Sequence, residues 1–139
     1  MRLTKMEIEL IRRSHDQVRE QLDEASSAFY DNLFEVSEEI RAMFRGDMQD
    51  QGMRFMTAIE VIVHALDAPE ELERTLQGLG AGHAALGVEP AHYAIMNDVL
   101  IDTLAQFAGE TWSADTEAAW RKALGEVAGR MREAAHPAT

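Results

Sequence analysis

Apolar residues recur at helical spacing along almost the whole of this chain of 139 residues. Near the N-terminus, Ile8, Ile11 and Val18 fall on one stripe of an α-helix because they are separated by three and seven residues. No segment alternates apolar and polar residues with the β-branched enrichment typical of strands. The pattern predicts one all-α domain of about seven helices over residues 1–139, with a tail that frays from about residue 136.

Capping residues and prolines divide this pattern into separate helices. Serine side chains favour helix N-caps, and proline suits the first helical turn. The predicted helices run from Thr4 to about Asp23, from a cap at Ser26 and Ser27, from Ser37 to near Phe44, from Gln49 or Gln51 to Leu66, from Glu70 to about Leu86, from Pro90 onward, and from Ser113 onward.

The charge and composition exclude several classes of function. With 25 acidic and 13 basic residues the formal net charge is -12, so nucleic acid and anionic membrane surfaces are not expected partners. The chain has no cysteine, which rules out disulfides and thiolate metal sites. No stretch approaches the roughly 20 apolar residues of a membrane span, and the N-terminus lacks the apolar core of a signal peptide. We therefore expect a cytoplasmic protein.

His83 is the strongest candidate for a ligand. It lies near the end of a predicted helix, in the run Gly80-Ala81-Gly82-His83-Ala84-Ala85, where small neighbours would let a flat ring approach the helix. A lone histidine on an apolar helix face is more often an ordinary core residue, so this interpretation depends on the surrounding pattern. The other histidines fit worse: His15 lies on an apolar stripe, His64 lies far from the expected pocket, His92 is expected to face solvent, and His136 is in the tail.

Several aromatic and polar residues accompany His83 in a specific order along the chain. Tyr30 and Phe44 come early, Gln51 and Phe55 share a helix face because they are four residues apart, and Tyr93 follows His83 by ten residues. Each of them is also compatible with an ordinary structural role. Together they provide one nitrogen ligand and an apolar slot, which suits an iron macrocycle better than a zinc ion that needs several converging ligands.

Four stretches carry a resemblance to a known family. They are Phe29-Tyr30-Asp31-Asn32-Leu33-Phe34, Met43-Phe44, Gln51-Gly52-Met53-Arg54-Phe55-Met56, and His83-Ala84-Ala85-Leu86-Gly87-Val88-Glu89-Pro90-Ala91-His92-Tyr93. From about Leu3 to Met131 the chain resembles bacterial single-domain globins and the globin module of flavohaemoglobins. The resemblance implies the globin fold, a three-on-three sandwich of helices, with haem b (iron protoporphyrin IX) as cofactor.

The resemblance also implies roles for individual residues. His83 matches the proximal ligand of the iron, Tyr30 and Gln51 match the distal pair that stabilises bound dioxygen, and Phe44 matches the aromatic residue stacked on the haem. Four further residues are expected at the cofactor: Phe55 over the iron, Arg54 near a propionate, and Leu79 and Val88 beside the macrocycle.

On the proximal side, Tyr93 matches a tyrosine that orients the histidine in flavohaemoglobins together with a glutamate of the last helix. The nearest candidate for that glutamate, Glu133, lies about one turn too early in the sequence.

The function implied is the binding of a diatomic gas: dioxygen, nitric oxide or carbon monoxide. Paired tyrosine and glutamine donors favour slow release of dioxygen, which suits nitric oxide dioxygenation supported by a separate reductase in trans. Two alternatives stay open: a non-catalytic gas or redox sensor, and a globin-shaped protein without cofactor. The sequence also leaves open whether the protein forms a homodimer.

Overall fold

The computed structural model describes the backbone of residues 3–44, 48–85 and 89–135. Within these ranges, the side chains of residues 48–53, 81–85, 90, 134 and 135 lie outside the description. The described part contains seven α-helices and one short 3₁₀ helix: α1 (Lys5–Arg19), α2 (Leu22–Val36), α3 (Glu38–Met43), α4 (Met48–His64), α5 (Pro69–Ala85), α6 (Pro90–Ala108), η1 (Gly109–Thr111) and α7 (Ala114–Ala135). The all-α prediction is therefore confirmed.

Local chemistry explains most of the helix ends. Thr4 and Glu7 form a reciprocal capping box at the start of α1, with N–H to oxygen distances of 3.1 and 2.8 Å. The hydroxyls of Ser37 and Ser113 accept backbone N–H groups at the starts of α3 and α7, as predicted. Gly109 ends α6 with a positive φ of 57°, a conformation that glycine adopts at little cost.

The boundary between α1 and α2 differs from the prediction. α1 ends at Arg19, and α2 begins at Leu22, so Ser26 is a buried residue inside α2 instead of its N-cap. The acidic residues Asp23 and Glu24 occupy the first turn of α2, where they complement the helix dipole. The predicted cap at Ser26 and Ser27 was wrong because the helix begins at Leu22, which leaves Ser26 buried and Ser27 exposed within it.

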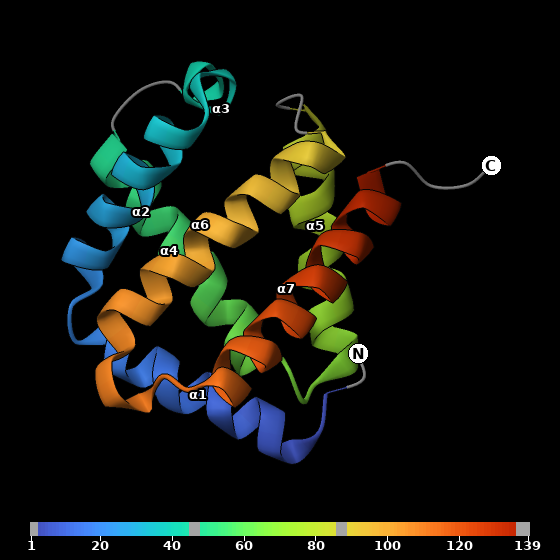
Figure 1. The fold of residues 1–139 in the computed structure, drawn as a ribbon. Helices are drawn as coiled ribbons and strands as arrows, with labels where there is room; N and C mark the ends of the chain where they lie inside the picture. Colours follow the sequence, from blue (N-terminus) through green and yellow to red (C-terminus); the bar gives the residue numbers. More distant parts are fainter. Residues whose placement is uncertain (1–2, 45–47, 86–88, 136–139) are drawn as a thin grey trace.

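The helices form two layers of three. α1, α4 and α5 make one layer, and α2, α6 and α7 make the other, with α3 joining α2 to α4. Figure 1 shows α6 and α7 in front of α4 and α5, and α1 crossing below the lower ends of α6 and α7. This arrangement agrees with the predicted three-on-three sandwich.

Part of the core lies where α1 crosses α6 and α7. Trp120 of α7 is 2% exposed, and its indole Nε1 donates to the Ser14 hydroxyl of α1 at 2.8 Å. That hydroxyl in turn donates to the carbonyl oxygen of Ile11, which satisfies a polar group inside an apolar region. None of the helices in the described part of the chain is both long and apolar enough to cross a membrane.

Candidate functional site

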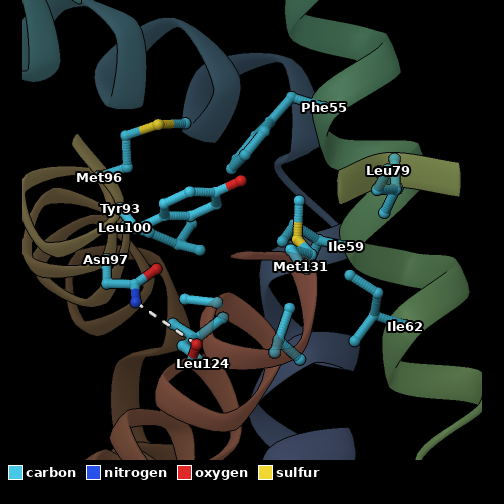
Figure 2. A pocket seen from close by; sticks show the side chains of 13 residues that line it. Phe55, Ile59, Ile62, Leu79, Tyr93, Met96, Asn97, Leu100, Leu124 and Met131 are labelled. Atoms are coloured by element: carbon cyan, nitrogen blue, oxygen red, sulfur yellow. Dashed lines mark hydrogen bonds between the residues drawn. The ribbon is translucent and has the colours of Figure 1, made fainter. Parts of the chain in front are cut away.

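A cavity lies between α4, α5, α6 and α7, at the end of the molecule opposite α1. It contains about 560 Å³ of empty space, counting the part that opens to solvent. Figure 2 shows side chains from all four helices around it. The residues lining it are mostly apolar: Phe55, Ala58, Ile59, Ile62, Leu79, Tyr93, Met96, Asn97, Leu100, Leu124, Val127, Ala128 and Met131.

Helical periodicity explains why these residues meet. On α4, Phe55, Ile59 and Ile62 are separated by four and three residues, so they occupy one face of the helix. The lining residues of α6 and α7 follow the same spacing from Tyr93 and from Leu124. The sequence therefore turns an apolar stripe of each helix toward the same space.

Two polar side chains belong to this lining. The Asn97 amide Nδ2 donates to the carbonyl oxygen of Leu124 at 3.4 Å, which ties α6 to α7 at the cavity wall. Tyr93 is 8% exposed, and burial raises the pKa of its phenol, an effect opposed by the charge of Arg132. Figure 2 shows the Tyr93 hydroxyl directed from α6 toward Phe55 on α4. Tyr93 thus brings a protonated hydroxyl to an otherwise apolar space.

An aromatic cluster adjoins the α4 side of the cavity. The Phe55 ring stacks on Phe29 with a centroid distance of 4.5 Å and lies 6.3 Å from Tyr30. Phe44 meets the edge of Tyr30 at 5.3 Å, and Phe34 packs on both of these rings. Burial raises the pKa of Tyr30 to about 12, so its hydroxyl stays protonated at neutral pH.

The structure brings together only part of the predicted site. Phe55, Leu79 and Tyr93 line the cavity. Tyr30 lies beside Phe55 in the aromatic cluster and Phe44 contacts Tyr30, but neither Tyr30 nor Phe44 lines the cavity. Arg54 is exposed and does not line the cavity either.

The remaining predicted residues lie outside the described part of the chain. This applies to the side chains of His83 and Gln51 and to Val88 as a whole. The backbone of position 83 is nevertheless part of α5, four residues beyond Leu79. Because successive helix residues turn by about 100°, position 83 lies within about 40° of position 79. Leu72 and Leu76, which fall on the same face of α5 as position 83 by helical spacing, are each 1% exposed.

His92 differs from its expected place. It is 4% exposed instead of facing solvent. Its Nδ1 accepts the backbone N–H of Glu89 at 2.9 Å, which caps α6, and its Nε2 lies 3.4 Å from the Glu39 carboxylate of α3. The prediction was wrong because this histidine is held by the start of its own helix and packed under α3. A histidine three residues after Glu89, at the third position of the helix that Pro90 begins, is compatible with such a cap, and this spacing was the available signal.

Asn97 was missed by the sequence interpretation. It follows Tyr93 by four residues, so the helical spacing that places Tyr93 at the cavity also places Asn97 there. Glu133, the candidate partner of Tyr93, is exposed on α7. The charge that acts on the pKa of Tyr93 is that of Arg132, the residue before Glu133, and it lowers this pKa.

A sequence model of the globin family matches residues 27–131. The chain belongs to the globin family. This membership accounts for the two layers of three helices and for the cavity between α4 and α5, and it implies a haem cofactor and a small gaseous ligand.

Several known globins are similar to this chain over most of its length. The anaerobic nitrite reductase NSHB5 of Oryza sativa subsp. indica is 27% identical over 134 residues, which is 90% of each chain. Leghemoglobin-1 of Lupinus luteus is 22% identical over 143 residues, covering 91% of each. The flavohemoprotein of Rhizobium meliloti (strain 1021) is 26% identical over 103 residues, which is 72% of this chain and 26% of that protein. The similarity to the flavohemoprotein therefore covers about a quarter of that protein's length.

The described residues fit a haem group. A haem is flat and largely apolar, and the cavity walls are apolar apart from Tyr93 and Asn97. Within the described residues, no three histidine, cysteine or acidic side chains gather in a way that could hold a metal ion directly. The apolar walls suit a macrocycle such as haem, which brings its own four metal ligands.

Proposed function

We propose that this globin binds haem b through His83 and uses it to bind dioxygen or nitric oxide. The observation that carries the proposal is the apolar cavity to which Phe55 contributes from α4 and Leu79, four residues before position 83, contributes from α5. A bound haem supplies an iron atom that, when ferrous, takes up a diatomic gas at its free axial position.

The residues of α4 and α2 would form the distal side. Phe55 limits the space above the macrocycle and excludes water, because its ring is held flat against Phe29. Tyr30 lies directly beside it and keeps its proton at neutral pH, and we propose its hydroxyl as the first donor. Gln51, one turn before Phe55 on α4, is the second proposed donor. Each donor would stabilise a partly negative dioxygen ligand by about 1 kcal/mol.

The residues of α5 and α6 would form the proximal side. Leu79 lines the cavity one turn before His83, and we propose that Val88 completes the apolar contact with the macrocycle. We propose that Tyr93, whose hydroxyl is directed into the cavity from α6 (Figure 2), orients the imidazole. We propose Arg54 as the residue nearest a haem propionate, because it is exposed one residue before Phe55.

Slow release of dioxygen favours nitric oxide dioxygenation as the activity. In this reaction, nitric oxide and dioxygen combine with one electron to give nitrate, and a separate reductase supplies the electron. The relatives called flavohemoproteins are about four times as long as the region matched here, which leaves room for a reductase in the same chain. For this globin the proposal places the reductase in trans and the reaction in the cytoplasm.

Reconstitution with haemin tests the axial ligand. We expect the wild type to bind one haem and to give the absorption spectrum of a histidine-ligated globin, with carbon monoxide binding after reduction. His83→Ala should lose most of its haem affinity, because the cavity then supplies no axial nitrogen. His64→Ala removes an exposed histidine of α4 and should behave as the wild type. Haem binding that is equal in His83→Ala and the wild type would overturn the proposal.

Nitrate formation tests the reaction itself. The reduced, haem-loaded protein is mixed with dioxygen and nitric oxide in the presence of a flavin-type reductase, and nitrate is measured over several turnovers. Stoichiometric nitrate with repeated turnover supports dioxygenation. Haem and gas binding without nitrate would contradict the enzymatic part and favour a sensor.

A further inference from the structure

Helices α5 and α7 approach each other closely at a glycine beside the cavity, Gly80. A methyl group added at Gly80 would overlap the backbone carbonyl oxygen of Met131 and would lie 3.0 Å from that residue's carbonyl carbon. Carbon atoms normally pack at about 3.5–4.0 Å. The neighbouring group is backbone, so it has no side-chain rotamer through which it could move aside.

This contact lies at the wall of the cavity. Leu79, next to Gly80 on α5, and the side chain of Met131 on α7 both line it. About two turns earlier on the same side of α5, Glu73 pairs with Arg130 at 3.1 Å. Leu76, which is 1% exposed, lies between these two points. Helices α5 and α7 therefore meet at the Glu73–Arg130 ion pair and, about two turns further along α5, at Gly80.

The helical register connects this contact to position 83. Position 83 lies about 40° from position 79, which lines the cavity, and about 60° from position 80, which touches α7. It therefore lies between the two directions. Any displacement of α5 away from α7 at Gly80 would carry position 83 with it, because the three residues belong to the same helical turn.

We propose that Gly80 is a positioning residue for the axial histidine: its backbone contact with Met131 sets the distance between α5 and the haem. The inference rests on the proposed role of His83 as iron ligand. On this inference, the spacing between α5 and α7 would set the length and strain of the bond between His83 and the iron. The side chains that line the cavity would not set them.

Gly80→Ala tests this directly, with Gly78→Ala as the matched control. Both substitutions add one methyl group to the same helix, but nothing lies within 4 Å of a methyl group at Gly78. In the ferrous, haem-loaded protein, Gly80→Ala should shift the iron–histidine stretching band in resonance Raman spectra. It should also release haem to an excess of acceptor protein about tenfold faster, a change that corresponds to about 1.4 kcal/mol. Gly78→Ala should leave both unchanged.

A second variant separates position from stability. Leu76→Val removes buried volume from the α5–α7 contact without changing the contact at Gly80. It should lower the thermal unfolding temperature and leave the stretching band in place. Leu76→Val keeps the inference testable even if Gly80→Ala fails to fold. A shift of the iron–histidine band in Leu76→Val would overturn the inference, because side-chain packing would then set the spacing between α5 and α7.

Failure of the inference and failure of the proposed function give different results. If His83 is not the ligand, the wild type itself will lack the iron–histidine band, or His83→Gly will retain it without added imidazole. If only the inference is wrong, the wild type will show the band, His83→Gly will lose it and recover it with imidazole, and Gly80→Ala will match the wild type.

Discussion

Helices α6 and α7 pack together along their length, but their two ends serve different purposes. At the closed end, where α1 crosses them, Trp120 and Ile11 are buried and the indole is paired with Ser14. At the open end, between Tyr93 and Met131, the same helices form one wall of the cavity. We infer that packing at the closed end stabilises the fold, whereas the less complete packing at the open end leaves space for a ligand.

The polar groups at the two ends follow the same division. At the closed end, the Ser14 hydroxyl accepts from Trp120 and donates to backbone carbonyls, so both polar side chains are satisfied within the core. At the open end, the hydroxyl of Tyr93 is directed into the cavity (Figure 2). A polar group at a cavity wall can contact a bound ligand, whereas one enclosed in the core contacts only other parts of the fold.

Trp120→Ala should give the largest effect on stability. The substitution removes a side chain that is 2% exposed and leaves a large void under α1. Losses of this kind amount to about 3–5 kcal/mol of the free energy of unfolding. Urea unfolding of the haem-free protein, followed by circular dichroism, measures the change. A loss below about 1 kcal/mol, in the range of ordinary surface substitutions, would mean that the closed end is not the main source of stability.

A matched pair of alanines on α7 tests the difference in packing. Ala119 is 1% exposed at the closed end, whereas Ala128 lines the cavity. Ala119→Leu should destabilise by about 1–3 kcal/mol because there is no room for the larger side chain. Ala128→Leu should stabilise the haem-free protein by about 0.5–2 kcal/mol by filling apolar space. The same urea titration checks both.

Haem titration completes that comparison. Ala128→Leu should bind haem more weakly than the wild type, because the leucine takes up space that the macrocycle needs, while any Ala119→Leu that remains folded should bind it normally. Destabilisation by both leucines would contradict the proposed difference between the two ends.

The extent to which the sequence predicted these two ends also differs. Helical periodicity identified the inward residues of α6 and α7, among them Tyr93 and Trp120, because an apolar stripe is a repeated signal. It did not identify His92, which is buried under α3 through contacts with Glu39 and Glu89. A single polar residue whose burial depends on a distant helix leaves no periodic trace in the sequence.

The same reasoning explains which parts of the site were predictable. Phe55, Leu79 and Tyr93 line one cavity because each belongs to an apolar helix face that can be read locally. The close approach at Gly80 could not be foreseen, because it depends on the backbone of Met131, 51 positions later in the chain. The boundary at Gln21 was also missed: α2 starts there without a side-chain cap, so no motif marks it.

Tyr30→Phe should affect ligand release more than stability. The phenol lies in the aromatic cluster beside Phe55, and its raised pKa of about 12 keeps the proton available. In the haem-loaded protein, removal of the hydroxyl should speed dioxygen release about tenfold, since one hydrogen bond contributes about 1 kcal/mol. Carbon monoxide, which is less polar, should be released at nearly the same rate. Stopped-flow displacement measures both rates, and equal acceleration for the two gases would exclude a donor role for Tyr30.

The smallest expected effect is a pH dependence of stability that arises from His15 on α1. This histidine is 5% exposed, and burial lowers its pKa below the ordinary value of 6.5, against the opposing charge of Glu60. Below about pH 6.5 the unfolded chain therefore takes up a proton that the folded protein does not, so His15 should reduce stability progressively as the pH falls toward its lowered pKa. Urea midpoints measured at pH 7.5 and 5.5 should differ less in His15→Gln than in the wild type. If both proteins lose the same stability between these pH values, other groups account for the acid sensitivity, and burial of His15 carries no titration cost in the folded protein.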